Sequence, residues 1–445
     1  MRKCLIIGLL LAVVLFLVPS TWAGGIDNKT NWSVEYVRSL NRNASTDAAD
    51  IAAYNPAGTT QMEDGLYGNV SVHYVGKKYT NTIDGDDSEA TDPSYIPGVF
   101  AVYKQERWAG MFAFSNYGGG GKVDYDDGTW TTQQAGLGII AAANAKLDLA
   151  EAGGLLPPAA PFANLWYYAD ITDQNIEAES MYLGYTLGGA YQINDMFSVS
   201  LGARLIQASR DAKGSITVSA ENSTVGTNPL VNPDQTADIE YSQEADGWGG
   251  ILGVNIAPTA ELNIGVRYET ETTLDFENSV DEDSLGLLPQ LGIEDGESDY
   301  RNLPAIFALG VSYQVNPQIR LESNLTYYFN ENADWNGAED DVDNGYDLGI
   351  GLMYGFSETL EASVGFLYTE TGVDPEHMTP EAPELNAKTI GAGVAWTPVD
   401  NLIVNFALGN AFYDKDSFTD DATDTKVEYE KNNLFVGFGL QYKFL

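Results

Sequence analysis

Apolar and polar residues alternate with a period of two over long stretches of the chain. In 198–210, Val199, Leu201 and Leu205 fall on one face of an extended segment, and Arg204 falls on the other. The same alternation recurs in 260–276, 317–329 and 400–413. Successive side chains of a β-strand point to opposite faces, so this pattern predicts strands with one apolar and one polar face.

The alternation predicts about fourteen strands along the chain. We place them at 67–79, 96–105, 108–118, 179–193, 196–210, 239–257, 260–276, 303–315, 317–329, 344–356, 358–370, 386–397, 400–413 and 432–444. An even number of antiparallel strands closes into a barrel with both chain ends on one side. The predicted fold class is therefore all-β, a transmembrane antiparallel β-barrel.

Connections between the predicted strands alternate between short and long. The short ones lie at Glu106-Arg107, Asn194-Asp195, Pro258-Thr259, Asn316, Ser357 and Pro398-Val399. The long ones are 80–95, 119–178, 211–238, 277–302, 330–343, 371–385 and 414–431. Bacterial outer-membrane barrels have short periplasmic turns and longer external loops. The alternation predicts a protein of the outer membrane whose long loops face outward.

Aromatic residues gather near the ends of the predicted strands, where the interfaces of a membrane would lie. They are Tyr103, Trp108, Tyr191, Trp248, Tyr268, Tyr313, Trp396 and Tyr413. A soluble sandwich or propeller, the structural alternative, does not require such girdles. The last strand carries an apolar stripe from Leu434 to Phe444 that resembles the signal read by the barrel-assembly machinery, although the chain continues to Leu445.

The chain begins with the features of a secretory signal peptide. Two basic residues precede the apolar run 5–18, and a small-residue cleavage pattern ends at Ala23. We therefore assign residues 1–23 to a signal peptide. Its apolar run is too short for an ordinary membrane helix, and no later run is longer. The single cysteine, Cys4, lies in this leader, so the mature chain is expected to lack thiols.

The charge balance narrows the range of partners. Asp and Glu number 64 against 22 Lys and Arg, which gives a formal net charge of −42. Nucleic acid is a poor partner for such a chain. The acidic clusters 84–87, 124–128, 281–283 and 339–345 lack the ligand spacing of an EF-hand, so we predict no metal site and no cofactor. Divalent bridging between these carboxylates and lipopolysaccharide remains open beside simple solvation.

An enzymatic function is the least supported class. His73 falls on the predicted lumen-facing side of the first strand, two residues from Ser71, so a nucleophile–base pair is one interpretation. A polar lumen side chain is the other. No Gly-x-Ser-x-Gly motif occurs in the chain. We predict that the protein is not an enzyme and has no catalytic residues.

Two segments fall outside the strand rhythm. Residues 24–66 are too many for a simple lead-in to the first strand. The loop 119–178 contains an Ala-rich stretch, 135–153, which predicts a pair of short helices, and then Leu155-Leu156-Pro157-Pro158. Either these helices form an apolar lid over the lumen or they decorate an ordinary loop.

The segment 38–58 resembles the hatch of the FadL/TodX family of outer-membrane transporters, and Asn55-Pro56-Ala57 matches the Asn-Pro-Ala motif of that family. The hairpins 303–329 and 386–413 look like its C-terminal half. The chain departs from the family at 37–42, where a Gly-rich opening is usual. The resemblance implies a barrel plugged by an N-terminal hatch, lipophilic cargo such as long-chain fatty acids or hydrocarbons, and exit sideways through a kinked strand.

A plug also has a physical reason. A barrel of about fourteen strands encloses more width than side chains alone can fill. Asn55, Pro56, Ala57 and Gly58 form a rigid bend rather than a strand, because proline fixes one backbone angle and donates no amide hydrogen. We assign residues 24–66 to the hatch and 67–445 to the barrel.

Two groups of residues are candidates for contact with the cargo. Lumen-facing cations are scarce, and they could hold the headgroup of a fatty acid or pair with carboxylates of the lumen; they are Arg204, Arg267 and Arg320. A run of glycines at the top of the third strand would weaken its ladder, as a lateral opening or a flexible loop entry requires; it comprises Gly118, Gly119, Gly120 and Gly121.

These features predict a monomeric outer-membrane protein for passive uptake of hydrophobic small molecules. Its expected partners are that ligand, the lipid and lipopolysaccharide of the outer membrane, and the assembly machinery during insertion. The alternatives are a general porin and a structural or adhesive envelope protein. A porin would conduct ions steadily, whereas a plugged carrier would be nearly silent.

Overall fold

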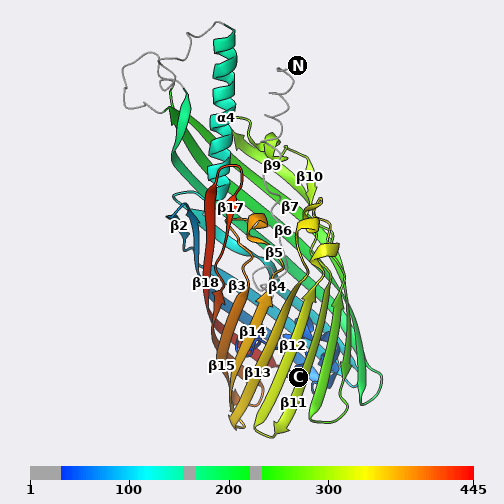
Figure 1. Ribbon diagram of the computed structural model, residues 1–445. Helices are drawn as coiled ribbons and strands as arrows, with labels where there is room; N and C mark the ends of the chain where they lie inside the picture. The colour runs from blue at the N-terminus through cyan, green and yellow to red at the C-terminus, as the bar shows by residue number, and fades with distance from the viewer. Residues whose placement is uncertain (1–31, 154–166, 221–232, 445) are drawn as a thin grey trace.

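The computed structural model describes residues 32–153, 167–220 and 233–444. The signal peptide assigned to 1–23, the stretch 155–158 and Leu445 lie outside the described residues. A closed, tilted barrel of antiparallel strands dominates the molecule (Figure 1). The predicted transmembrane-type barrel with a segment inside its lumen is confirmed.

The strands and helices have the following bounds. The strands are β1 (Gly65–Ile83), β2 (Asp86–Ala90), β3 (Ser94–Gln105), β4 (Trp108–Tyr125), β5 (Tyr168–Gln192), β6 (Phe197–Ala220), β7 (Gln235–Ile256), β8 (Leu262–Glu269), β9 (Asp275–Asp283), β10 (Ser298–Tyr300), β11 (Ile306–Asn316), β12 (Ile319–Tyr328), β13 (Gly345–Ser357), β14 (Leu360–Glu370), β15 (Ala387–Val399), β16 (Leu402–Tyr413), β17 (Asp416–Asp420) and β18 (Thr425–Lys443). The helices are α2 (Val34–Val37), α3 (Ile51–Tyr54) and α4 (Trp130–Ala152), with 3-10 turns η2 (Pro56–Gln61), η4 (Leu288–Leu291), η5 (Asn330–Asn332), η6 (Ala338–Asp341) and η7 (Pro375–His377).

The described strands occupy fourteen positions around the barrel wall, as the sequence predicted, and we call each position a stave. Four staves consist of two strands in succession, because one neighbour pairs with both: β2 with β3, β8 with β9, β10 with β11, and β16 with β17. β1 pairs with β18 over their whole length and so closes the wall.

Several strands run much further than the alternation predicted. β5 has 25 residues, β6 has 24 and β4 has 18. They extend into the predicted loops 119–178 and 211–238, and β17 and β18 occupy most of 414–431. The prediction of irregular loops there was wrong. Beyond the membrane the outward face becomes polar and the inward face apolar, so the pattern that marks a lipid-facing strand is lost.

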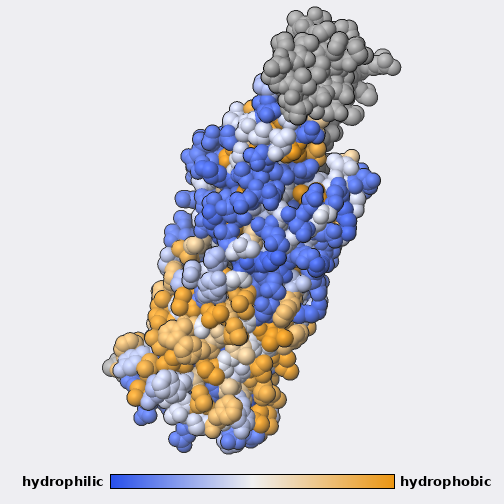
Figure 2. Space-filling view, turned by 90° about the vertical axis from the view of Figure 1, so that its left-hand side faces the viewer, coloured by the Kyte–Doolittle hydropathy of each residue, from blue (hydrophilic) through white to orange (hydrophobic). Residues whose placement is uncertain are grey.

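Figure 2 shows an apolar band near the end with short turns and a mainly hydrophilic surface above it. Exposed apolar residues on the other strands of the wall continue this band around the barrel. On β6, Val199 and Leu201 point outward and are exposed, whereas Ser198 and Ser200 are buried in the lumen. Spanning a bilayer takes about 9–11 residues of tilted strand. More than half of β6 therefore stands beyond the band, at the long-loop end.

Aromatic rings mark the edges of this band. Trp248, Trp108 and Tyr103 are exposed on the outer face, as expected for girdle residues. Tyr413 differs from the prediction. It has the same parity on β16 as the buried Asn405 and Ala407, and its hydroxyl accepts a hydrogen bond from Asn433 Nδ2. Tyr413 thus points inward rather than toward the membrane.

The Ala-rich stretch forms one helix, α4, instead of the predicted pair (Figure 1). Ala and other good helix formers continue through it without a proline to divide it. Its first half packs inside the upper wall, where Ile139 and Ala143 cluster with Ile216 and Val218 of β6. No helix within the described ranges is long and apolar enough to cross a membrane.

Residues 32–62, the plug segment, lie inside the barrel at the level of the apolar band and are almost all buried. Its backbone follows the inner wall closely. A Cβ added at Gly265, Gly365 or Gly391 would collide with a carbonyl oxygen of the plug segment. Inward-facing glycines therefore allow the plug backbone to lie against several strands.

Candidate functional site

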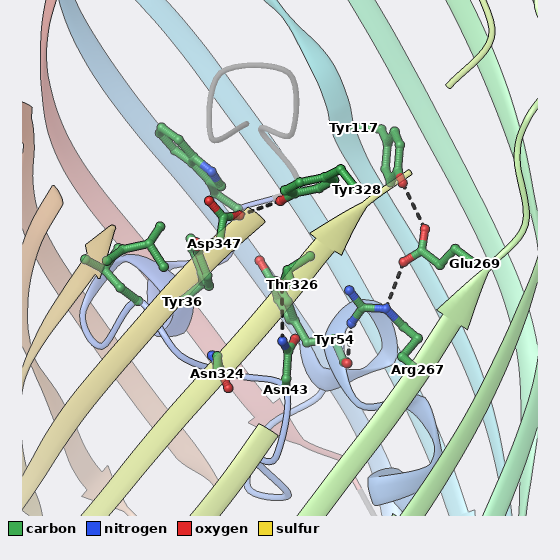
Figure 3. A pocket seen from close by; sticks show the side chains of 13 residues that line it. Tyr36, Asn43, Tyr54, Tyr117, Arg267, Glu269, Asn324, Thr326, Tyr328 and Asp347 are labelled. Atoms are coloured by element: carbon green, nitrogen blue, oxygen red, sulfur yellow. Dashed lines mark hydrogen bonds and ion pairs between the residues drawn. The ribbon is translucent and has the colours of Figure 1, made fainter. Parts of the chain in front are cut away.

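A cavity lies in the lumen directly above the plug segment (Figure 3). The space between the side chains of this lower cavity amounts to about 580 Å³ when open solvent is included. Its walls are Trp32, Tyr36, Leu40, Asn43, Tyr54, Tyr117, Arg267, Glu269, Asn324, Thr326, Tyr328, Asp347 and Leu367. The plug supplies its floor, and strands from opposite sides of the barrel supply the rest.

Five aromatic rings line the lower cavity, and their polar atoms are largely occupied. Tyr36 and Tyr54 of the plug stack with ring centroids 5.4 Å apart. Tyr54 Oη accepts the Ser33 amide, Tyr117 Oη donates to Glu269 at 2.8 Å, and Tyr328 Oη donates to Asp347. The cavity therefore presents ring faces to a ligand beside polar groups such as Asn43 and Trp32 Nε1, which has no hydrogen-bond partner among the described residues.

Each charged group that lines the lower cavity is paired within the protein. Arg267 Nε lies 2.8 Å from Glu269 Oε1, and Arg267 also donates to the carbonyl of Tyr54. Asp347 accepts hydrogen bonds from Tyr328 and from Thr369 Oγ1. The three charges have a net value of −1, so the lining does not attract an anion.

The structure separates the three candidate arginines. Arg267 lines the lower cavity, whereas Arg204 lies behind it and pairs with Glu269. Arg320 is further down, where Nη2 lies 2.7 Å from Asp47 of the plug and Nε lies 3.5 Å from Glu322. All three have carboxylate partners. Of the two interpretations of these cations, pairing with carboxylates of the lumen is therefore the one that the structure shows.

The motif Asn55-Pro56-Ala57 joins the plug segment to the wall. Asn55 caps η2, with its Oδ1 accepting the Gly58 amide, and Pro56 occupies the first turn of that helix. Asn55 Nδ2 donates to Asn255 Oδ1 of β7 at 2.8 Å and to the Ser45 carbonyl at 3.0 Å. The bend is therefore a fixed attachment point rather than a free loop.

The four glycines lie in a double bulge of β4. Tyr117 is one extra residue between the pairs Asn116↔Leu183 and Gly118↔Tyr182, and a second irregularity follows before Gly121↔Ser180. Gly119 and Gly121 have φ values of +87° and +70°, which other residues rarely adopt. The bulge and the positive φ values interrupt the regular pairing of β4 with β5 at these glycines.

A gap in the ladder accompanies the bulge. The β3–β4 pairing runs only from Gln105↔Trp108 to Gly98↔Ser115, so residues 94–97 of β3 pair with β1 alone. Pro97 has no amide hydrogen to continue a ladder. We call the interval between 94–97 and 116–121 the wall gap.

Side chains close the wall gap in this structure. Lys77 Nζ donates to the carbonyls of Gly120 and Lys122 at 2.8 and 2.5 Å, and Ser94 Oγ donates to the Gly120 carbonyl at 3.0 Å. These carbonyls would otherwise bond to a neighbouring strand. A few side-chain contacts therefore replace part of a continuous ladder.

A larger space, the upper cavity, begins at the wall gap and extends toward the long loops. It has a volume of about 1460 Å³, continuous with solvent, and Gly120 and Gly121 belong to its lining. Residues 376–382 and the start of α4 cover it. Cargo entering from the long-loop end would meet this space before the lower cavity.

The inner loop, residues 371–386, folds into the barrel, whereas 371–385 was predicted to be a long external loop. Met378 and Leu385 are buried, and both Glu381 oxygens accept hydroxyl bonds, from Thr129 at 2.6 Å and Thr131 at 3.2 Å. Burial raises the pKa of the Glu381 carboxyl, against the lowering effect of those hydrogen bonds. The three prolines of 375–383 were the only local signal of an ordered loop.

The acidic clusters do not form an evident metal centre. In the ranges that the structure describes, no group of three or more His, Asp or Glu side chains is placed to hold a metal ion. His73 is fully buried beside Trp32, with ring centroids 6.0 Å apart. It therefore lies against the plug and not in an open site.

Comparison with known proteins relates this architecture to a protein family. A family model described as outer membrane protein transport protein (OMPP1/FadL/TodX) matches residues 172–444. No curated protein sequence matches the chain.

Solved structures share the whole fold. A FadL homologue of Pseudomonas aeruginosa has a TM-score of 0.67 at 13% identity, with 95% of this chain and 100% of that chain covered. The toluene transporter TbuX of Ralstonia pickettii has a TM-score of 0.59 at 15% identity, with 93% and 98% covered. The toluene transporter TodX of P. putida has a TM-score of 0.59 at 13% identity, with 91% and 97% covered.

At such identities the structural likeness concerns the fold alone. The family match is independent of it and covers more than half of the chain. That family consists of transport proteins of the outer membrane and not of enzymes. The chain, with its plugged fourteen-stave barrel, belongs to the OMPP1/FadL/TodX family of outer membrane transport proteins.

Proposed function

We propose that the protein carries neutral hydrophobic molecules, of the size of small aromatic hydrocarbons, passively across the outer membrane. The observation that carries this proposal is the lower cavity, where ring faces surround a space in which every lining charge already has a partner. These walls suit a ligand that brings apolar surface and no charge. Two of the similar structures are toluene transporters, which agrees with this choice.

A carboxylate ligand fits the lower cavity less well. To dock on Arg267 it would have to compete with Glu269 and would lie near a second carboxylate, Asp347. Taking an anion out of water without a cation of its own is costly. The fatty-acid alternative therefore requires that Arg267 change partners when the ligand arrives.

The proposed route begins at the long loops, which face the exterior, and passes through the upper cavity into the lower one. Lateral exit would use the wall gap at Gly118 to Gly121, where side chains replace part of the ladder. A hydrophobic molecule leaving there would enter lipid and not water. The plug, proposed to comprise residues 24–66, closes the axial path.

The outer surface supports the proposed surroundings of the barrel. The apolar band would contact lipid, and the acidic wall above it would face lipopolysaccharide, with divalent cations needed between carboxylates and lipid phosphates. A monomer assembled by the barrel-assembly machinery is the simplest form. Removal of divalent cations should loosen this contact without altering the lower cavity.

Binding measurements on the purified protein test the proposed cargo. Toluene should bind more tightly than decanoate, as measured by titration calorimetry in detergent. Tyr36→Ala should weaken toluene binding about three- to tenfold, since one ring contact is lost. Tyr313→Ala is the control, because Tyr313 is exposed on the outer wall at β11, away from the wall gap. Tighter binding of decanoate, lost in Arg267→Gln, would instead support a fatty-acid carrier.

A further inference from the structure

The contacts of one carboxylate connect three irregular points of the molecule: the end of β8, the bulge of β4 and the plug bend. Glu269 is the last residue of β8, where its stave is interrupted before β9. Its Oε2 accepts hydrogen bonds from Tyr117 Oη at 2.8 Å and from Arg204, and its Oε1 lies 2.8 Å from Arg267 Nε. Glu269 therefore contacts residues of β4, β6 and β8. Figure 3 shows its contacts with Tyr117 and Arg267.

One branch leads to the plug. Arg267 donates through Nη1 to the carbonyl of Tyr54, the residue immediately before the Asn55-Pro56-Ala57 bend. Arg267 is only 6% exposed. Any displacement of the bend that moves this carbonyl would act directly on the guanidinium and, through it, on Glu269.

The other branch leads to the wall gap. Tyr117 is the extra residue of the β4 bulge, directly before Gly118, and a bulge re-aims the side chain that it carries. The Tyr117 ring lies against the guanidinium of Arg204, 4.3 Å from its centroid, while its hydroxyl is bound to Glu269. The position of the bulge is therefore tied to the same carboxylate as the plug.

We infer that Glu269 is a positioning residue that couples the plug bend to the wall gap through Arg267 on one side and Tyr117 on the other. The inference rests on the proposed function in taking the wall gap as the exit. A ligand in the lower cavity touches all three side chains, since each of them lines it. Occupancy of the cavity would thereby be transmitted to the plug and to the exit together.

The coupling is tested without any ligand, by a double-mutant cycle read by hydrogen exchange. Asn55→Ala releases the plug bend from Asn255 and Ser45, and should speed amide exchange in 117–122 roughly fivefold, the factor for losing about one buried hydrogen bond. In a Tyr117→Phe background the same change should produce no additional increase. Tyr117→Phe is preferred to Glu269→Gln, which would leave two buried guanidiniums uncompensated.

Tyr182→Phe is the matched control. Tyr182 lies opposite Gly118 on β5 and its hydroxyl bonds to Arg210. In this background the effect of Asn55→Ala on 117–122 should persist in full. Asn255→Ala, which leaves the plug sequence unchanged, replaces Asn55→Ala if that variant fails to fold.

An effect of equal size with and without the Tyr117 hydroxyl would overturn the inference, as would the absence of any effect on 117–122. Because no cargo is present, these outcomes are independent of the binding measurements on toluene and decanoate. Failure of the coupling and failure of the proposed function are therefore distinguishable.

Discussion

The lower and upper halves of the same strands follow opposite rules. On β6, even-numbered residues face the lumen throughout, from Ser198 in the lower wall to Ile216 in the upper wall. Odd-numbered residues face outward, from Leu201 below to Lys213 above. The strand keeps its geometry while the polarity of its two faces is exchanged. The surroundings, lipid below and water above, decide which face must be apolar.

The contents of the lumen differ in how they meet the wall. Below, the plug segment combines apolar clusters, such as Ile51 with Phe100, with polar pairs such as Arg320 with Asp47 and Asn55 with Asn255. Above, α4 meets the wall through an apolar cluster around Ile216. The lower half is thus a membrane barrel whose plug is held by both apolar and polar contacts, and the upper half resembles a small soluble barrel with its own core.

The largest expected effect comes from removing the contents of each half. Deleting residues 24–60 should raise single-channel conductance from near zero to porin-like values, because the plug fills the lumen at the level of the membrane. Replacing 375–384 by a Gly-Ser linker should leave the pore silent, since the plug remains. Both variants should keep heat-modifiable gel mobility. A folded deletion variant that stays silent would show that the plug does not close the pore.

A charge introduced on the outer face should destabilise the protein in the lower half and have little effect in the upper half. Leu201→Arg places a guanidinium in lipid and should lower the free energy of unfolding by about 2–4 kcal/mol, measured in denaturant with vesicle-inserted protein. Gln207 lies six residues after Leu201 on the same outward face of β6. Gln207→Arg should change the free energy of unfolding by less than about 0.5 kcal/mol. Equal tolerance of both substitutions would place the membrane boundary elsewhere.

A smaller effect is expected on the inner face. Ile216→Val removes one methylene from the cluster under α4 and should lower the local opening free energy of α4 by about 1 kcal/mol, measured by hydrogen exchange. Ser200→Ala in the lower lumen should be nearly neutral, because Ser200 Oγ has no hydrogen-bond partner among the described residues. A larger loss of stability in Ser200→Ala than in Ile216→Val would contradict this comparison of the two halves.

The smallest effect concerns pH. Burial raises the pKa of Glu381 above its ordinary value of 4.5, so the folded inner loop binds a proton more tightly than the open loop. Docking of 371–386 should therefore be strongest below pH 4.5 and weaken as the pH rises through the window between that value and the raised pKa. Glu381→Gln should abolish this dependence in exchange measurements. A loop that becomes more protected as the pH rises would contradict the assignment.

The alternation predicted the lower wall because lipid demands an apolar outer face at every second residue. It failed beyond residue 210, where outward Asp211 and Lys213 alternate with inward Ala212 and Gly214, a pattern that a loop can also have. The sequence pattern therefore located the strands in the part of the barrel that contacts lipid. Their extension depends on contacts with α4 and the inner loop, which no local pattern records.

The candidate site was predictable only where a single segment carries the signal. The glycines of β4 and the Asn55 bend stand out locally, and both lie at irregular points of the structure. The association of Tyr54, Tyr117 and Glu269 brings together segments far apart in the chain, so periodicity could not find it. For the same reason the sequence left open whether Arg267 was free for a ligand.

A reversible lock across the wall gap tests the central claim most directly. A Cβ at Gly121 would lie 3.4 Å from Ser94 Cβ, close to the separation in a disulfide, and the mature chain is expected to have no other cysteine. Toluene transfer through Ser94→Cys/Gly121→Cys protein should stop when the pair is oxidised and resume on reduction, with each single variant unaffected. Equal transfer by the oxidised and reduced forms would contradict lateral passage of hydrophobic cargo through this wall.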